Sequence, residues 1–242
     1  MTARKHLLAL LILLVLGSDV FAQEKKWSNA GELSFIDTGG NSNVTTLSVK
    51  NLVKHRFSEK VEGSWKIGVL YGKSDNVTNS ESYLTELRAD YLFTNQLYAA
   101  LIAGWLKNTF AGIDARYYVG PSVGYKFLMG PKHFLKSEAS LNYTKEEYTD
   151  NTSGEYLSGK VFALYEYSFS DKNKFSQSVE YIYDFSNADN YNINSITAII
   201  SALSDNLSLK SSYEVKYDNE PVPSTLDKTD TILALTLLIN YN

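Results

Sequence analysis

The amino-acid sequence predicts an all-β protein. We expect a single antiparallel transmembrane β-barrel of about 12 strands, within a range of about 10–14, after a cleaved signal peptide. Three observations predict this class. Apolar and polar residues alternate along most of the chain, turn residues interrupt the alternation at regular intervals, and aromatic residues gather near both ends of the alternating segments. Backbone groups in lipid must be hydrogen-bonded within the protein, so only helices and closed barrels span membranes.

The alternation is clearest in the last segment, residues 229–241. Its odd positions include Leu233 and Leu235, whereas its even positions include Asp230 and Thr236. Residues two apart lie on the same face of a strand, so one face is apolar and the other is mixed. The same odd-apolar pattern recurs in segments 60–73, 81–93, 114–128 and 206–218. A slip by one residue would place charges in lipid at about 2–4 kcal/mol each, so the register is well specified. Segments 96–108 and 191–203 are apolar on both faces, which leaves their orientation open.

Twelve such segments follow one another, each longer than the 9–11 residues, roughly, that a tilted transmembrane strand needs. They are about 27–37, 43–57, 60–73, 81–93, 96–108, 114–128, 134–148, 155–169, 174–186, 191–203, 206–218 and 228–241. Short turns at 58–59, 94–95, 129–132, 170–173 and 204–205 alternate with longer polar links at 38–42, 74–80, 109–113, 149–154, 186–190 and 219–227. This alternation predicts periplasmic turns and external loops, with both ends of the barrel on the periplasmic side.

Aromatic residues at odd positions predict two membrane-interface belts. The expected periplasmic belt consists of Trp27, Phe57, Phe93, Phe127, Phe169, Phe175 and Tyr241. The expected external belt consists of Phe35, Tyr71, Tyr83, Tyr117, Tyr143, Phe185, Tyr191 and Tyr217. A soluble β-sandwich would instead bury its aromatic residues in the middle of its strands.

Residues 1–22 are expected to be a signal peptide, with the barrel domain at residues 23–242. Arg4 and Lys5 precede an apolar run at 7–16, and Ala22 ends a small-residue cleavage site. The run is too short for a spanning helix, which needs about 20 apolar residues. An N-terminal anchor helix is the alternative.

Composition excludes several classes of function. The formal net charge is −4 and no run of Lys or Arg occurs, which argues against nucleic acid as a partner. The absence of Cys and the presence of only three His, at His6, His55 and His133, argue against zinc binding. A membrane-embedded hydrolase would need a His base toward the external side, but His55 and His133 fall at periplasmic ends. We therefore expect no enzymatic activity, metal or cofactor.

The even positions of the segments carry charges of both signs, which are expected to face the barrel interior. The candidates are Glu62, Lys66, Glu86, Arg88, Asp90, Arg116, Lys126, Lys160, Glu166, Glu180, Asp184, Lys210, Glu214 and Lys216. One interpretation is a lumen whose charges set ion selectivity. The other, which the bulk of inward Tyr156, Phe162 and Leu164 favours, is a network of ion pairs that fills or constricts the interior.

The stretch from Trp27 to Asn43 reads W-x3-G-E-L-S-F followed by T-G-G-N-S-N. It resembles a family of outer-membrane proteins of unknown function whose members are labelled salt-induced. The resemblance implies an outer-membrane barrel and no established activity. Such barrels usually end on an aromatic residue that the assembly machinery reads, whereas Asn242 follows Tyr241 here.

We therefore expect a bacterial outer-membrane barrel that acts as a narrow channel or as a stress-related structural protein. The alternative is a closed-lumen barrel that binds a hydrophobic ligand or a surface partner. Expected partners are outer-membrane lipid, lipopolysaccharide and the barrel assembly machinery. The sequence leaves the oligomeric state open.

Overall fold

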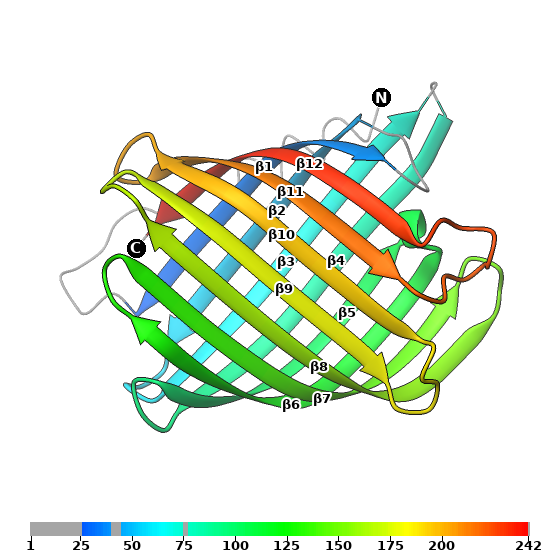
Figure 1. Cartoon of the computed structure of the whole chain (residues 1–242), viewed down its shortest axis with the longest axis horizontal. Coiled ribbons are helices and arrows are strands. Elements are labelled where there is room, and N and C mark those ends of the chain that lie inside the picture. Colours follow the sequence, from blue (N-terminus) through cyan, green and yellow to red (C-terminus); the bar gives the residue numbers. More distant parts are fainter. Residues whose placement is uncertain (1–25, 40–44, 75–76, 242) are drawn as a thin grey trace.

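The structure, a computed structural model, describes residues 26–39, 45–74 and 77–241. These residues form a closed barrel of twelve antiparallel strands and one short 3-10 helix (Figure 1). The strands are β1 (Trp27–Gly39), β2 (Thr45–Arg56), β3 (Val61–Ser74), β4 (Val77–Leu92), β5 (Leu97–Asn108), β6 (Ile113–Met129), β7 (His133–Tyr148), β8 (Ser153–Ser168), β9 (Asn173–Asp184), β10 (Tyr191–Ala202), β11 (Leu207–Asp218) and β12 (Thr229–Tyr241). The helix η1 (Thr109–Ala111) lies between β5 and β6. The predicted fold class is confirmed.

Each strand pairs with its neighbours in the chain, and β12 returns to pair with β1. Leu33 lies opposite Leu237 in this closing pair. On the inner face of the same pair, the Ser34 and Thr236 hydroxyls form a hydrogen bond of 2.7 Å. An open sheet would leave the backbone groups of β1 and β12 unpaired at its two edges. Closing the barrel pairs these groups with each other. The last strand therefore closes on the first, as its alternation predicts.

The two faces of the sheet follow residue parity. All large apolar residues that the structure shows as exposed are odd-numbered, with the single exception of Leu128. A register shift between Lys126 and Leu128 explains the exception, because an extra residue in one strand reverses the side-chain alternation. The inner face carries small, polar and charged residues, among them Ser48 and Glu146, which are almost fully buried.

The two strands that are apolar on both faces obey the same rule. In β5, Tyr98 and Ile102 are buried while Leu101 is 56% exposed on the outer face. In β10, Ala198 is buried and Ile199 is exposed. Pairing with neighbours of clear alternation thus sets an orientation that these two strands do not specify themselves.

The connections define two ends of the barrel. At the turn end, where β1 begins and β12 ends, the connections are 57–60, 93–96, 130–132, 169–172 and 203–206. At the loop end the described connections are 109–112, 149–152, 185–190 and 219–228. The predicted polar link at 74–80 is wrong in extent, because β3 and β4 continue their pairing to Ser74 and Val77. A strand continues as long as its backbone N–H and C=O groups find partners on the next strand, even where its side chains are polar.

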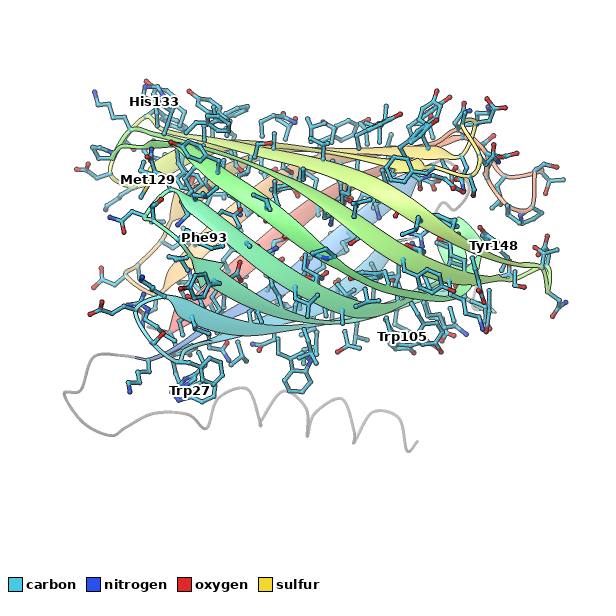
Figure 2. All side chains as sticks on the ribbon, turned by 90° about the horizontal axis from the view of Figure 1, so that it is seen from below. Trp27, Phe93, Trp105, Met129, His133 and Tyr148 are labelled. Carbon is cyan, nitrogen blue, oxygen red and sulfur yellow. The ribbon has the colours of Figure 1, made fainter. Side chains whose placement is uncertain are left out.

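Aromatic side chains surround both ends (Figure 2). At the turn end, the His55 ring contacts Trp27 in a tilted arrangement with ring centroids 4.1 Å apart and meets Phe57 edge-on at 4.6 Å. Also at this end, the His133 ring stacks on Tyr167 and its Nδ1 lies 2.8 Å from the Tyr165 hydroxyl. Both histidines therefore sit among aromatic residues at the barrel end, where the sequence places them.

The expected signal peptide at residues 1–22, and Asn242, lie outside the described residues. Within the described part of the chain, no helix is long and apolar enough to cross a membrane.

Candidate functional site

Three cavities follow one another along the barrel interior. The largest, about 700 Å³, opens at the turn end and is here called the vestibule. A middle cavity of about 320 Å³ shares Lys66 and Glu86 with the vestibule. A third of about 180 Å³ lies at the loop end and shares Arg116 and Glu180 with the middle cavity. The interior is thus a row of adjoining spaces, each lined by charged side chains, rather than a packed core.

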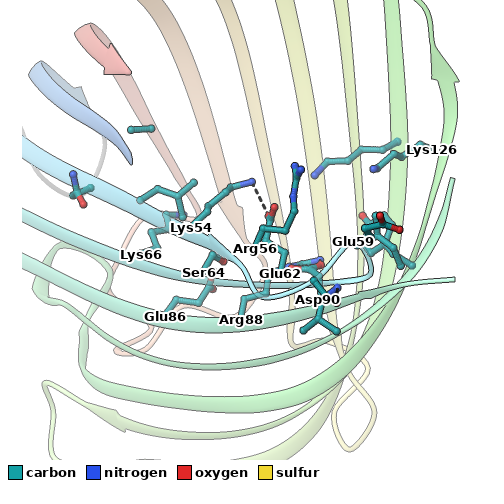
Figure 3. A pocket seen from close by; sticks show the side chains of 18 of the residues that line it. Lys54, Arg56, Glu59, Glu62, Ser64, Lys66, Glu86, Arg88, Asp90 and Lys126 are labelled. Carbon is teal, nitrogen blue, oxygen red and sulfur yellow. Dashed lines mark hydrogen bonds and ion pairs between the residues drawn. The ribbon is translucent and has the colours of Figure 1, made fainter. Parts of the chain in front are cut away.

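Arg88 holds two carboxylates against the vestibule wall. Its Nη2 donates to Asp90 at 2.7 Å and to Glu138 at 2.8 Å, and its Nε and Nη1 make further bonds to the same two groups. The Tyr98 hydroxyl also donates to Glu138, at 2.9 Å. Such bidentate contacts fix the guanidinium in the plane of its partners. Figure 3 shows Arg88 and Asp90 side by side along the vestibule.

A second group of ion pairs lies toward the loop end. Glu146 is almost fully buried, forms an ion pair with Arg116 and accepts a hydrogen bond from the Tyr148 hydroxyl. Nearby, Lys160 lies 3.4 Å from Glu180. A buried carboxylate is costly unless it is paired and hydrogen-bonded, and these groups satisfy each other.

Two tyrosines lie across glycines to reach a glutamate on the next strand. Tyr118 in β6 lies opposite Gly104 in β5, and its hydroxyl donates to Glu86 in β4 at 2.6 Å. A Cβ on Gly104 would collide with the Tyr118 ring. The missing side chain therefore lets the ring lie flat along the wall, which leaves the space in front of it open.

The same arrangement occurs in the opposite direction on the neighbouring strands. Tyr98 in β5 lies opposite Gly124 in β6, and its hydroxyl reaches Glu138 in β7. A Cβ on Gly124 would likewise collide with the Tyr98 ring. Each arrangement links three consecutive strands, so together they tie β4 to β7 through their inner faces.

Several vestibule cations have no carboxylate within ion-pair distance among the described residues. Lys126 and Lys136 lie directly opposite each other in the β6–β7 pairing. Both line the vestibule and neither forms an ion pair. Instead, Lys126 lies over the Tyr98 ring at 5.9 Å and Lys136 over the Phe162 ring at 5.6 Å. Like charges directly opposite each other on two strands are destabilising, so this pair opposes the stability of the sheet.

The β11–β12 connection, residues 219–228, reaches across the mouth at the loop end. Leu226 Cδ1 would lie 3.2 Å from a Cβ on Gly112, and the Val222 carbonyl packs still closer to this glycine. Gly112 has a φ of 72°, a conformation that suits glycine. The β11–β12 and β5–β6 connections lie on opposite sides of the twelve-strand ring, so the connection caps the third cavity.

Eleven of the fourteen interior candidates from the sequence line one of the three cavities, and Glu166, Lys210 and Glu214 line none of them. Glu62, Lys66, Glu86, Arg88, Asp90 and Lys126 line the vestibule. Arg116, Lys160, Glu180 and Asp184 line the middle cavity, and Lys216 lines the third. Glu166 forms an ion pair with Lys174, and Glu214 forms one with Lys216. Lys210 lies opposite Thr236 in the β11–β12 pairing.

The structure adds residues that the sequence reasoning missed. Glu138 accepts hydrogen bonds from Arg88, and Glu146 accepts one from Arg116, although neither glutamate was among the candidates. Both glutamates occupy even positions of an alternating segment, and this pattern alone predicts that they face the interior. Tyr98 and Tyr118 gave no such signal, because their role depends on a glycine in the strand beside them. Among the described residues, no group of three or more His, Cys, Asp or Glu side chains could hold a metal ion.

The fold and the charged interior define a class, the porin-like barrels. The structure is similar to the NanC porin, with a TM-score of 0.61 and 6% identity over 86% of this chain and 98% of that one. It is also similar to an outer membrane channel from Pseudomonas putida F1, with a TM-score of 0.59 and 8% identity over 93% of this chain and 100% of that one. At these identities the likeness concerns the fold.

The sequence then gives the family. Residues 31–241 match the model described as "Protein of unknown function, DUF481", and the chain belongs to this family. It is 28% identical over 173 residues to "Uncharacterized protein YdiY" of Escherichia coli strain K12, covering 69% of this chain and 67% of that protein. The family resemblance read from Trp27 to Asn43 is confirmed.

Proposed function

We propose that the protein forms a narrow, water-filled passage through the bacterial outer membrane, constricted at its loop end. The observation that carries this proposal is the row of three cavities, which share wall residues from one end of the barrel to the other. Their walls are polar and charged, and part of this charge is held in ion pairs on the wall, such as Arg88 with Asp90 and Lys160 with Glu180. A lumen built in this way stays hydrated.

The outer face supports the membrane location. Leu87, Leu141 and Val161 are each more than half exposed, and they belong to an apolar band that covers the outer face. Monomeric soluble proteins rarely expose contiguous apolar patches larger than a few hundred Å². Lipid is the partner that such a band fits, with rings at both ends of the strands at the headgroup level.

The loop end carries features that suit the external leaflet. On the outer face, Lys107 forms ion pairs with Glu81 and Asp114, and the Tyr143 hydroxyl donates to Glu155. Charged pairs at this height fit the phosphate and sugar groups of lipopolysaccharide. The turn end, with its short connections, then faces the periplasm. Insertion by the barrel assembly machinery follows from the same placement.

The test is single-channel recording on refolded protein in planar bilayers, comparing the native chain with one in which residues 221–226 are replaced by Gly-Ser-Gly. We expect discrete conductance steps from the native protein. Steps from the shortened protein should be larger, because the cap over the third cavity is gone. A matched control replaces Ser204 and Asp205 in a turn that lines none of the three cavities.

Silence of both proteins at high protein load would contradict a channel. It would favour the alternative of a closed barrel whose function lies at its surface. Equal conductance of the native and shortened proteins would contradict a constriction by residues 219–228 but would leave the channel itself supported.

A further inference from the structure

The vestibule contains more cations than its carboxylates can pair. Among its acidic groups, Glu62 is held by Lys54 at 3.3 Å, and Asp90 is held by Arg88. Glu138, behind the wall, is held by the same arginine. Glu86 accepts its hydrogen bond from Tyr118. Glu32 and Glu59 also line the vestibule, and neither forms an ion pair among the described residues. Seven cationic and five acidic side chains line this cavity, so its cations outnumber its carboxylates by two.

The cations that remain point into the same space. Five cations line the vestibule without an ion pair among the described residues, namely Lys50, Arg56, Lys66, Lys126 and Lys136. In the view of Figure 3, Lys126 lies at one side of the cavity and Lys54 at the other, with Arg56 between them.

The Lys126–Lys136 pair is the sharpest of these observations. A sheet that places two lysines directly opposite each other, with no carboxylate between them, is less stable than one with a neutral residue at either position. An anion between the two ammonium groups would reverse this, since each lysine would then make a charge-assisted hydrogen bond. The Lys126 ammonium group lies over the Tyr98 ring and the Lys136 ammonium group over the Phe162 ring, so both are placed along the inner wall by ring contacts and not by carboxylates.

We propose that the vestibule is a binding site for a small water-soluble polyanion bearing carboxylate or phosphate groups, held by Lys126 and Lys136 together with Arg56. The proposal deepens the proposed function, because it names the class of solute that the passage would attract. With a volume of about 700 Å³, the vestibule has room for a solute larger than a single ion. The cations would concentrate such solutes at the periplasmic mouth.

Calorimetric titration of folded protein in detergent, with inorganic pyrophosphate as the probe at low ionic strength, tests the site directly. We expect saturable binding to the native protein. Lys126→Gln and Lys136→Gln should each weaken it about tenfold, the loss expected for one charge-assisted contact. The matched control is Lys174→Gln, an inward lysine at the same end of the barrel that pairs with Glu166 at 2.7 Å and lies outside the vestibule lining. This control should bind pyrophosphate as the native protein does.

The unfolding temperature with and without pyrophosphate is a second measurement. It distinguishes anion binding by Lys126 and Lys136 from a purely structural role of these residues. In buffer without polyanions, Lys126→Gln should unfold at a higher temperature than the native protein, because the repulsion with Lys136 is gone. Added pyrophosphate should raise the unfolding temperature of the native protein and leave that of the variant nearly unchanged. A native protein that pyrophosphate neither binds nor stabilises would overturn the proposal, as would equal binding to all three variants.

Reversal potentials in asymmetric KCl separate this inference from the channel itself. A conducting native protein should favour chloride over potassium, and the Lys126→Gln/Lys136→Gln protein should lose that preference. Conductance without anion preference would count against the vestibule site while leaving the channel in place. Pyrophosphate binding without conductance would contradict the channel and leave the site in place.

Discussion

At the scale of single residues, two glycines in the barrel wall make room for tyrosine rings because they have no Cβ. Gly104 and Gly124 each permit a tyrosine of the neighbouring strand to lie flat and reach a glutamate one strand further on. Without the glycine, the ring would stand up into the lumen and the carboxylate would lose its donor. An unpaired carboxylate in this partly enclosed space costs free energy, so the three residues work as a unit.

We therefore predict that Gly104→Ala destabilises the barrel by about 1–3 kcal/mol, the usual cost of forcing extra volume into a packed site. The added Cβ meets the Tyr118 ring and displaces its hydroxyl from Glu86. Urea unfolding in lipid vesicles measures the effect. Gly154→Ala is the control, since nothing lies within 4 Å of its added Cβ. Equal stability of both variants would show that the ring is free to move.

At the scale of the strand, parity decides which environment a side chain meets. Leu87 in β4 is 59% exposed on the outer face, and the next residue, Arg88, points into the lumen. Opposite them in β3 lie Trp65 and Ser64. Two neighbouring positions on one strand therefore differ in environment, because one side chain faces hydrocarbon and the next faces water.

This difference predicts opposite tolerance to the same substitution. Leu87→Lys should destabilise the folded protein in bilayers by about 2–4 kcal/mol, the cost of a charge on the lipid face near the midplane. Ser64→Lys places the same charge in the vestibule, where water solvates it, and should cost less than about 1 kcal/mol. The comparison is made by urea unfolding in vesicles. A larger cost for Ser64→Lys would contradict the assignment of faces.

At the scale of the whole molecule, the barrel differs at its two ends. The turn end opens into the vestibule, whereas the loop end is narrowed by the cap at residues 219–228. The aromatic belts mark the same axis, with Trp27 at the turn end and Trp105 toward the loop end (Figure 2). Trp65 lies between them along the strands, and its indole N–H donates to Thr85 at 3.0 Å on the outer face.

The position of the barrel in the bilayer can be read from these tryptophans. In proteins that retain one tryptophan at a time, Trp27 and Trp105 should be quenched most by lipids brominated near the headgroup. Trp65 should be quenched most by lipids brominated deeper in the acyl chain. Fluorescence in vesicles of each brominated lipid measures this. An identical depth profile for all three positions would contradict a barrel that spans the bilayer along its axis.

The sequence by itself predicted about 12 strands, within a range of about 10–14, and the face on which the charges of the clearly alternating segments lie. It could do so because a period of two places every second side chain in the same environment, so the pattern is local to each strand. It also indicated His55 and His133 as residues of the barrel end, since they fall at segment ends among aromatic residues.

Only the tertiary structure decided how the inward charges pair, which side β5 and β10 turn inward, and where the interior stays open. Arg88 reaches Glu138 fifty residues away, and Lys126 meets Lys136 without a partner acid. The contact of Val222 with Gly112 joins opposite sides of the ring. These contacts cross strands and the lumen, and their geometry follows from barrel closure, which no single strand encodes.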